Sequence, residues 1–125
     1  MERGYSYRFN PPAPMLLLSA TAPLSMENAR VDALIDSGSD MTVLPVEMVH
    51  RLGIPRVGFV LMSGVDQETR EVPVYAVALG LDGVLPPSIH RVVAWEKDYG
   101  LLGRDVLNKV VLLLHGPERR LEVRS

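Results

Sequence analysis

The stretch Val31-Asp32-Ala33-Leu34-Ile35-Asp36-Ser37-Gly38 places a carboxylate on a short polar turn directly after an apolar run. Val31, Ala33 and Ile35 alternate along the run, which predicts a half-buried strand over residues 29–35. A loop is expected over 36–40, because Asp and Ser side chains bond to nearby backbone and Gly permits a tight turn. Taken alone, Asp-Ser-Gly favours an ordinary turn over a reactive carboxylate.

A second pattern lies far downstream, at Leu101-Leu102-Gly103-Arg104-Asp105-Val106-Leu107. Two apolar residues lead into Gly103 and an adjacent pair of opposite charges, and a short helix is expected over 103–108. The spacing of Gly103-Arg104-Asp105 does not fit a phosphate-binding glycine loop. By itself this segment indicates no function, and it becomes informative only together with the first pattern.

Together the two patterns resemble the signatures of the retropepsin-type aspartic proteases. Ala33–Asp40 resembles the active-site motif of that family almost position for position, and Leu101–Leu107 resembles its second motif at about the right distance. The resemblance extends over roughly residues 29–123. It implies a small closed β-barrel and a homodimer that cuts extended peptides without a metal or organic cofactor.

The resemblance also implies a role for each residue of the turn. The chemistry needs two carboxylates that share a proton, and the chain carries one Asp-Ser-Gly, so Asp36 of two copies would form the catalytic pair. One carboxylate takes a proton from water while the other, protonated, polarises the peptide carbonyl. Ser37 would send its hydroxyl across the dimer axis, and Gly38 would let the backbone approach the substrate.

Further family roles fall on residues around the turn. Arg104 would pair with Asp40 beneath the loop, in a directional and often bidentate contact. Asp40 would also meet the substrate backbone, and the carbonyl of Gly38 would accept a substrate N–H. Met41 and Leu101 would line the cleft. The plainer alternatives are a surface ion pair, or no pair at all, for Arg104 and simple core packing for Met41 and Leu101.

The segment Ser63–Glu68 occupies the place of the family's flap, the hairpin that closes over the substrate. Gly64 would supply freedom at the tip, and Gly64 and Val65 would contact the substrate. The tip is polar where retroviral flaps are apolar and Gly-rich, which concerns substrate preference more than activity. An ordinary solvated hairpin is the alternative.

The rest of the chain alternates short apolar runs with turn residues, which predicts an all-β fold: a small closed β-barrel with one or two short helices. Strands are expected over residues 15–21, 29–35, 42–44, 56–62, 71–79, 88–94, 109–114 and 120–123, and helices over 45–52 and 103–108.

The N-terminal segment, residues 1–14, is expected to be an extended arm that precedes a protease domain over 15–125. Pro11, Pro12 and Pro14 suit a paired sheet poorly, since proline lacks a backbone donor. The retroviral enzymes weave both chain ends into their dimer interface. We therefore expect this dimer to rest on the active-site loops and another strand, and to be weak at low concentration.

Composition limits the other possibilities. A chain of 125 residues with 47% apolar residues fits one globular domain, and a net charge of −2 gives no electrostatic reason to expect nucleic acid or an anionic membrane. The chain has no cysteine, so thiol catalysis and zinc–thiolate sites are excluded. His50, His90 and His115 lack metal-ligand spacing. No run reaches the roughly 18 apolar residues of a membrane span, and we expect a cytoplasmic protein.

Two other classes of function stay open. The same dimeric barrel could bind peptides without cutting them. Alternatively, Asp-Ser-Gly could be coincidental in an unrelated domain, which a monomer at high concentration would favour.

Overall fold

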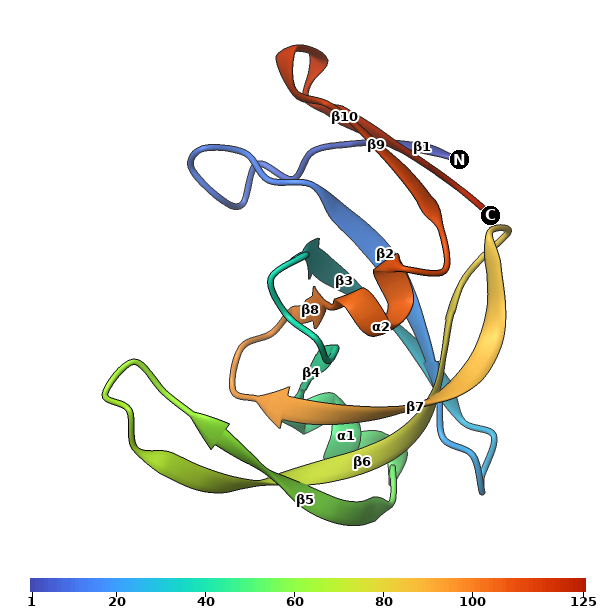
Figure 1. Cartoon of the computed structure of the whole chain (residues 1–125). Helices are drawn as coiled ribbons and strands as arrows, with labels where there is room; N and C mark the ends of the chain where they lie inside the picture. The colour runs from blue at the N-terminus through green and yellow to red at the C-terminus, as the bar shows by residue number, and fades with distance from the viewer.

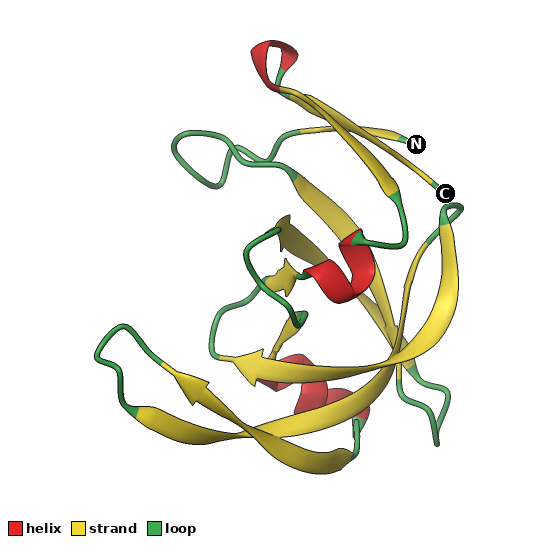
Figure 2. Cartoon of the chain, in the orientation of Figure 1, coloured by secondary structure: helices red, strands yellow, loops and turns green.

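A computed structural model describes all 125 residues. Strands dominate it, with short helices at their ends (Figures 1 and 2). The strands are β1 (Glu2–Gly4), β2 (Met15–Thr21), β3 (Asn28–Ile35), β4 (Val43–Pro45), β5 (Arg56–Ser63), β6 (Thr69–Leu81), β7 (Leu85–Trp95), β8 (Gly100–Leu102), β9 (Val111–His115) and β10 (Arg120–Arg124). The helices are α1 (Val46–Leu52), α2 (Arg104–Leu107) and a 3-10 turn, η1 (Gly116–Glu118).

Six strands close into a barrel. They follow the order β2-β3-β8-β4-β7-β6, and β6 pairs again with β2 to complete the ring. Strand β5 lies outside the ring and pairs with β6 alone, so the two form a long hairpin that extends from the barrel (Figure 1). The predicted closed β-barrel is confirmed.

The core fills the barrel and the space under α1. Leu16, Leu18, Leu44 and Leu79 are fully buried in one apolar cluster of 18 buried residues. Helix α1 adds one apolar side of its surface to this cluster and ends at Gly53, whose φ of 64° lies in the left-handed region that glycine tolerates. The predicted helix is therefore present, with proline just before its first turn.

The two ends of the chain form a second, smaller sheet in the order β1-β10-β9. The Met1 amino group donates to the Val123 carbonyl (2.9 Å), and Arg3 pairs with Asp32 of β3 (2.7 Å). Within the segment expected to be an extended arm, residues 1–14, the first residues form β1 and pair with β10, and the prolines follow this strand in the chain. Residues 5–14 then form a loop with one bridge, between Ser6 and Ala13.

Two strands were missed in the sequence, β1 and β8. Each has three residues, too few to show an alternating pattern, and each is held by a partner distant in sequence. Strand β8 lies parallel to β3, with Ala33 opposite Gly100 and Ile35 opposite Leu102. This pairing brings the two sequence motifs together.

Candidate active site

Asp36 lies directly after β3, where the strand leaves the barrel wall. Its backbone N–H donates to the carbonyl of Leu102 at the end of β8 (3.0 Å), which extends the β3–β8 pairing by one step. The first and second motifs are therefore neighbours in space, and the position of the carboxylate is fixed by strands on both sides.

The turn after Asp36 is held by its own side chain. The Gly38 N–H donates to Asp36 Oδ1 (3.0 Å), and the Ser39 N–H donates to the Asp36 carbonyl (3.2 Å). A Cβ on Gly38 would lie 3.2 Å from Asp36 Oδ1, so a glycine keeps the carboxylate uncrowded. Ser37 is exposed, and its hydroxyl makes no hydrogen bond within the chain.

Arg104 supports this turn, but by a different contact from the one expected. Its Nη1 donates to the Ser37 carbonyl (2.7 Å), and its backbone N–H donates to the Ser39 carbonyl (2.8 Å). No ion pair joins Arg104 to Asp40, whose side chain is exposed. The expected Arg104–Asp40 pair is therefore wrong for this chain, because the guanidinium is engaged by a backbone carbonyl of the turn.

Gly103 allows the two motifs to touch. A Cβ at this position would lie 2.6 Å from the carbonyl carbon and 2.7 Å from the carbonyl oxygen of Met41, and 3.0 Å from the Ser39 carbonyl oxygen. Backbone atoms cannot move aside to relieve such a clash as the end of a flexible side chain can. Any larger residue at 103 would separate the motifs.

The residues expected to line the substrate cleft also come together. Met41 and Leu101 pack against a small buried cluster of Val43, Val74 and Val93, next to the base of the β5–β6 hairpin. Met41 also borders a hollow of about 430 Å³, which is lined in addition by Val60, Val74, Ile89, His90, Arg91 and Asp105. Their proximity is compatible with core packing and with a cleft wall.

The predicted flap is a hairpin tip between β5 and β6. Val65 is fully exposed at the tip, and Gly64 exchanges backbone hydrogen bonds with Gln67 and Glu68. The residue of the tip whose backbone is in the left-handed region is Gln67, with φ of 62°. The conformational freedom expected of Gly64 is therefore needed at Gln67 instead. Arg70 lies 3.6 Å from Asp66 and 3.7 Å from Glu68, which gives the tip a charged surface.

The comparisons with known proteins agree with this geometry. The aspartyl protease family model matches residues 22–106, which include the first motif, the hairpin and all but the last residue of the second motif. This chain belongs to the aspartyl protease family. No curated protein sequence matches it.

Solved structures show that the chain has the retropepsin fold. The EIAV protease complexed with the inhibitor HBY-793 is similar with a TM-score of 0.59 and 20% identity, covering 78% of this chain and 86% of the viral one. A retropepsin-like aspartic protease from Rickettsia conorii gives 0.59 at 12% identity, covering 98% and 96%. The simian foamy virus protease gives 0.56 at 18% identity, covering 76% and 92%. The recognition made from the motifs is confirmed.

The sequence analysis missed one support of the segment after the Asp36 turn, the contact between Thr42 and Asp105. The Thr42 hydroxyl donates to Asp105 Oδ1 (2.7 Å), and its backbone N–H donates to Oδ2 (3.1 Å). The same hydroxyl accepts from the Gly103 N–H (3.1 Å). Thr42 is fully buried, so these bonds are protected from water. The feature of the sequence that could have indicated this contact is the polar residue Thr42 within the expected strand 42–44.

A buried histidine extends this network. His90 Nδ1 lies 3.7 Å from Asp105 Oδ2, while Nε2 lies 3.2 Å from Lys109 Nζ and 3.1 Å from Ser88 Oγ. An ammonium group only donates, so Nε2 of the neutral ring accepts and Nδ1 carries the proton toward Asp105. Burial, and then the positive charge of Lys109, lower the pKa of His90, and Asp105 opposes the change.

No cluster of three or more His, Asp or Glu side chains is placed to hold a metal ion. None of the helices has the length and apolar character that crossing a bilayer requires.

Proposed function

We propose that two copies of this chain form an aspartic endopeptidase in which Asp36 and the partner's Asp36 share one proton across a two-fold axis. The observation that carries the proposal is the Asp36 turn itself. It presents one carboxylate per chain, half-buried and oriented by the Gly38 N–H, beside an exposed Ser37 hydroxyl with no partner in its own chain. Membership in the aspartyl protease family supports it.

The reaction uses water and the two carboxyl groups. The ionised Asp36 takes a proton from water as the water oxygen bonds to the peptide carbonyl carbon, and the protonated partner carboxyl gives its proton to the carbonyl oxygen. A proton then passes to the amide nitrogen as the C–N bond breaks, which releases a carboxylic acid and an amine. Two like charges held close disfavour double ionisation, so the pair retains one proton.

An extended peptide is the proposed substrate. It would lie between the hairpin tip at Gly64 and Val65 and the floor formed by Met41 and Leu101. The Gly38 carbonyl would accept a substrate N–H, and exposed Asp40 would meet the peptide backbone. Hydrogen bonds to the peptide backbone would supply affinity, and alternating side-chain pockets would supply selectivity. The charged surface of the tip favours peptides with polar side chains near the scissile bond.

The test is cleavage of casein and of a mixed peptide library from pH 4 to 7, comparing wild type with Asp36→Asn and with a statine-type inhibitor. Asparagine keeps an oxygen that can accept the Gly38 N–H, so the variant should fold while losing the acid–base group. We expect the rate to fall by at least about 100-fold. Equal cleavage by both proteins would refute the proposal. Peptide binding by both, with cleavage by neither, would instead identify a silent binding module.

A further inference from the structure

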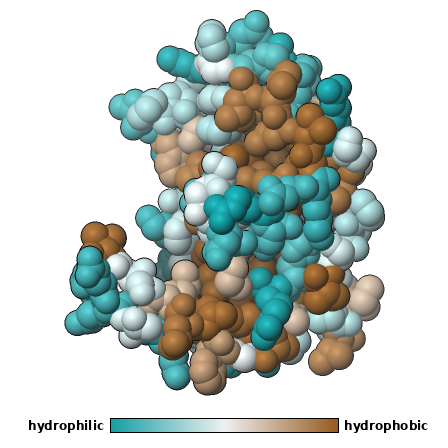
Figure 3. All heavy atoms as spheres, in the orientation of Figure 1, coloured by the Kyte–Doolittle hydropathy of each residue, from teal (hydrophilic) through white to brown (hydrophobic).

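The loop of the N-terminal arm lies on the same side of the molecule as the proposed substrate cleft. In Figure 1 the loop over residues 5–14 and the hairpin tip lie at the two ends of this side, with the Asp36 turn and the loop over residues 96–99 between them. Figure 3, in the same orientation, shows the surface indented between the arm and the tip. The proposed function places an extended peptide along this indentation.

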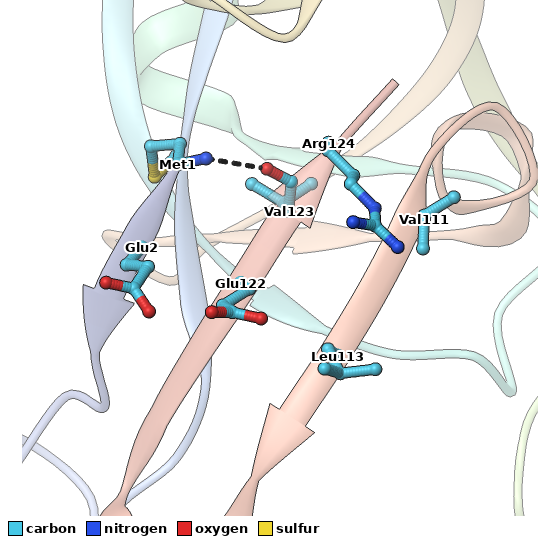
Figure 4. Close-up of a pocket in the computed structure, with 7 residues that line it drawn as sticks. All are labelled: Met1, Glu2, Val111, Leu113, Glu122, Val123 and Arg124. Carbon is cyan, nitrogen blue, oxygen red and sulfur yellow. Dashed lines mark hydrogen bonds between the residues drawn. The ribbon is translucent and has the colours of Figure 1, made fainter.

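The arm is anchored at both of its ends. Strand β1 pairs with β10, and the Met1 amino group donates to the Val123 carbonyl (2.9 Å; Figure 4). Strand β2, at the other end of the arm, belongs to the barrel wall. The loop between the two strands contains no strand of its own, so its position depends on the contacts that its side chains make.

The middle of this loop contacts residues 96–99, the loop between β7 and β8. Arg8 Nη2 donates to Asp98 Oδ1 (2.6 Å), and the Arg8 guanidinium lies 4.9 Å from the centre of the Tyr99 ring. The Phe9 ring meets the Tyr99 ring edge to face, with 5.2 Å between the ring centres. An ion pair, a cation–π contact and an aromatic pair therefore join the two loops.

Tyr99 is also held by residues close to it in sequence. Its carbonyl accepts a hydrogen bond from the indole N–H of Trp95 (2.7 Å), and the two ring centres lie 5.4 Å apart. The Lys97 ammonium lies 5.6 Å from the centre of the Trp95 ring and 5.8 Å from that of Tyr99. Among the hydrogen bonds and ring contacts of residues 96–99, those to Arg8 and Phe9 are the ones that reach a distant segment.

The 96–99 loop borders the proposed substrate floor. Trp95 before the loop and Leu101 after it pack against the same small buried cluster as Met41. Leu101 lies on β8, which pairs with β3, the strand that leads into the Asp36 turn. Because packed side chains transmit a shift to their neighbours, a movement of this loop would displace the floor.

We propose that Arg8 and Phe9 are positioning residues for substrate binding, which hold the 96–99 loop, and with it Leu101, at the edge of the substrate floor. The inference rests on the proposed function, because it takes Met41 and Leu101 as that floor. It makes the arm a working part of the domain that it precedes in the chain. Neither residue touches the reacting atoms, so its loss weakens peptide binding and leaves the chemical step unchanged.

The test uses Trp95, the single tryptophan of the chain, as a reporter of the loop. Arg8→Met removes the charge and Phe9→Leu removes the ring, so each should loosen the loop and shift Trp95 emission to longer wavelength as water reaches the indole. The KM for a cleaved peptide should rise at least about fivefold, with kcat unchanged. Arg8→Lys keeps a cation near Asp98 and the Tyr99 ring, so it should restore most of both properties.

Two controls match these variants. Arg30→Met breaks another exposed ion pair, that with Asp82, and the Arg30 side chain is 46% exposed, against 40% for Arg8. Tyr7→Leu removes an aromatic ring from the same arm, but Tyr7 is 70% exposed and belongs to neither of the ring pairs. Both controls should keep the emission and the KM of wild type. Kinetics are measured at an enzyme concentration where wild-type activity per chain is constant, which keeps subunit dissociation out of the KM.

The two readouts separate this inference from the proposed function. A wild type that cuts no peptide would contradict the proposed function, while a shift of Trp95 emission in Arg8→Met and Phe9→Leu, and in neither control, would still support the hold on the loop. Emission and KM equal to those of wild type in both variants would overturn the inference. A shifted emission with an unchanged KM would overturn it too, because the loop would then move without affecting substrate binding.

Discussion

Thr42 gives the sharpest test of how the segment after the Asp36 turn is held. Thr42→Val keeps the shape of the side chain and removes its hydroxyl, which donates to Asp105 (2.7 Å) and accepts from Gly103 (3.1 Å). A hydrogen bond to a charged group contributes about 1.5–3 kcal/mol, and a buried N–H left without a partner costs about 1–3 kcal/mol. Since both groups are affected, we expect the free energy of unfolding to fall by the sum of the two contributions, about 2.5–6 kcal/mol.

The assay is urea unfolding of wild type, Thr42→Val and Thr42→Ser. Serine keeps the hydroxyl and loses only a methyl group, so most of the stability should return with it. A double-mutant cycle with Asp105→Ala isolates the pair, and its coupling energy should lie within about 0.5–3 kcal/mol. If Thr42→Val unfolds within about 0.5 kcal/mol of wild type, the range typical of an uninvolved surface position, the hydroxyl does not hold the loop.

Two further predictions follow from the same region. Gly103→Ala should lower the free energy of unfolding by about 1–3 kcal/mol or more, because the new methyl group meets the Met41 carbonyl. In the control Gly116→Ala, where nothing lies within 4 Å, the free energy of unfolding should stay within about 0.5 kcal/mol of wild type. Equal losses in the two variants would contradict the packing argument. The lowered pKa of His90 makes wild type lose stability as pH falls below about 6.5, since the unfolded chain binds a proton that the folded chain resists. Urea unfolding from pH 8 to 5 should therefore show a shallower acid-side loss for His90→Gln, and parallel curves would exclude His90 as the cause.

Local patterns in the sequence predict the elements whose determinants are local. Strand β2 has the bounds expected from its apolar run, and α1 follows from Pro45 before it and Gly53 after it. The Asp36 turn is equally local, because its hydrogen bond joins residues two apart. In each case the residues that decide the structure lie within a few positions of one another.

Contacts between distant segments account for what the sequence analysis missed. Strand β8 is a strand because β3 lies beside it, and Thr42 meets Asp105 across 63 positions. The Arg104 guanidinium has two acceptors near the same turn, the Asp40 carboxylate and the Ser37 carbonyl, and the expected Arg104–Asp40 pair assumed the first. The carbonyl of Ser37 is the one that the guanidinium reaches. Neither hydrophobic periodicity nor residue type predicts which of the two acceptors is used.

The contacts of the Asp36 turn differ between its two sides. On the side facing its own chain, the β3–β8 pairing, Arg104 and the Gly103–Met41 contact hold the backbone, and Thr42 and Asp105 lock the segment that follows. On the other side, the Ser37 hydroxyl has no hydrogen-bond partner within the chain, and the chain supplies no second carboxylate to pair with Asp36. A turn that existed only to connect β3 to β4 would not need so many contacts on one side. The second motif fixes the carboxylate in place, and the proposed dimer then has only to bring two such fixed turns together.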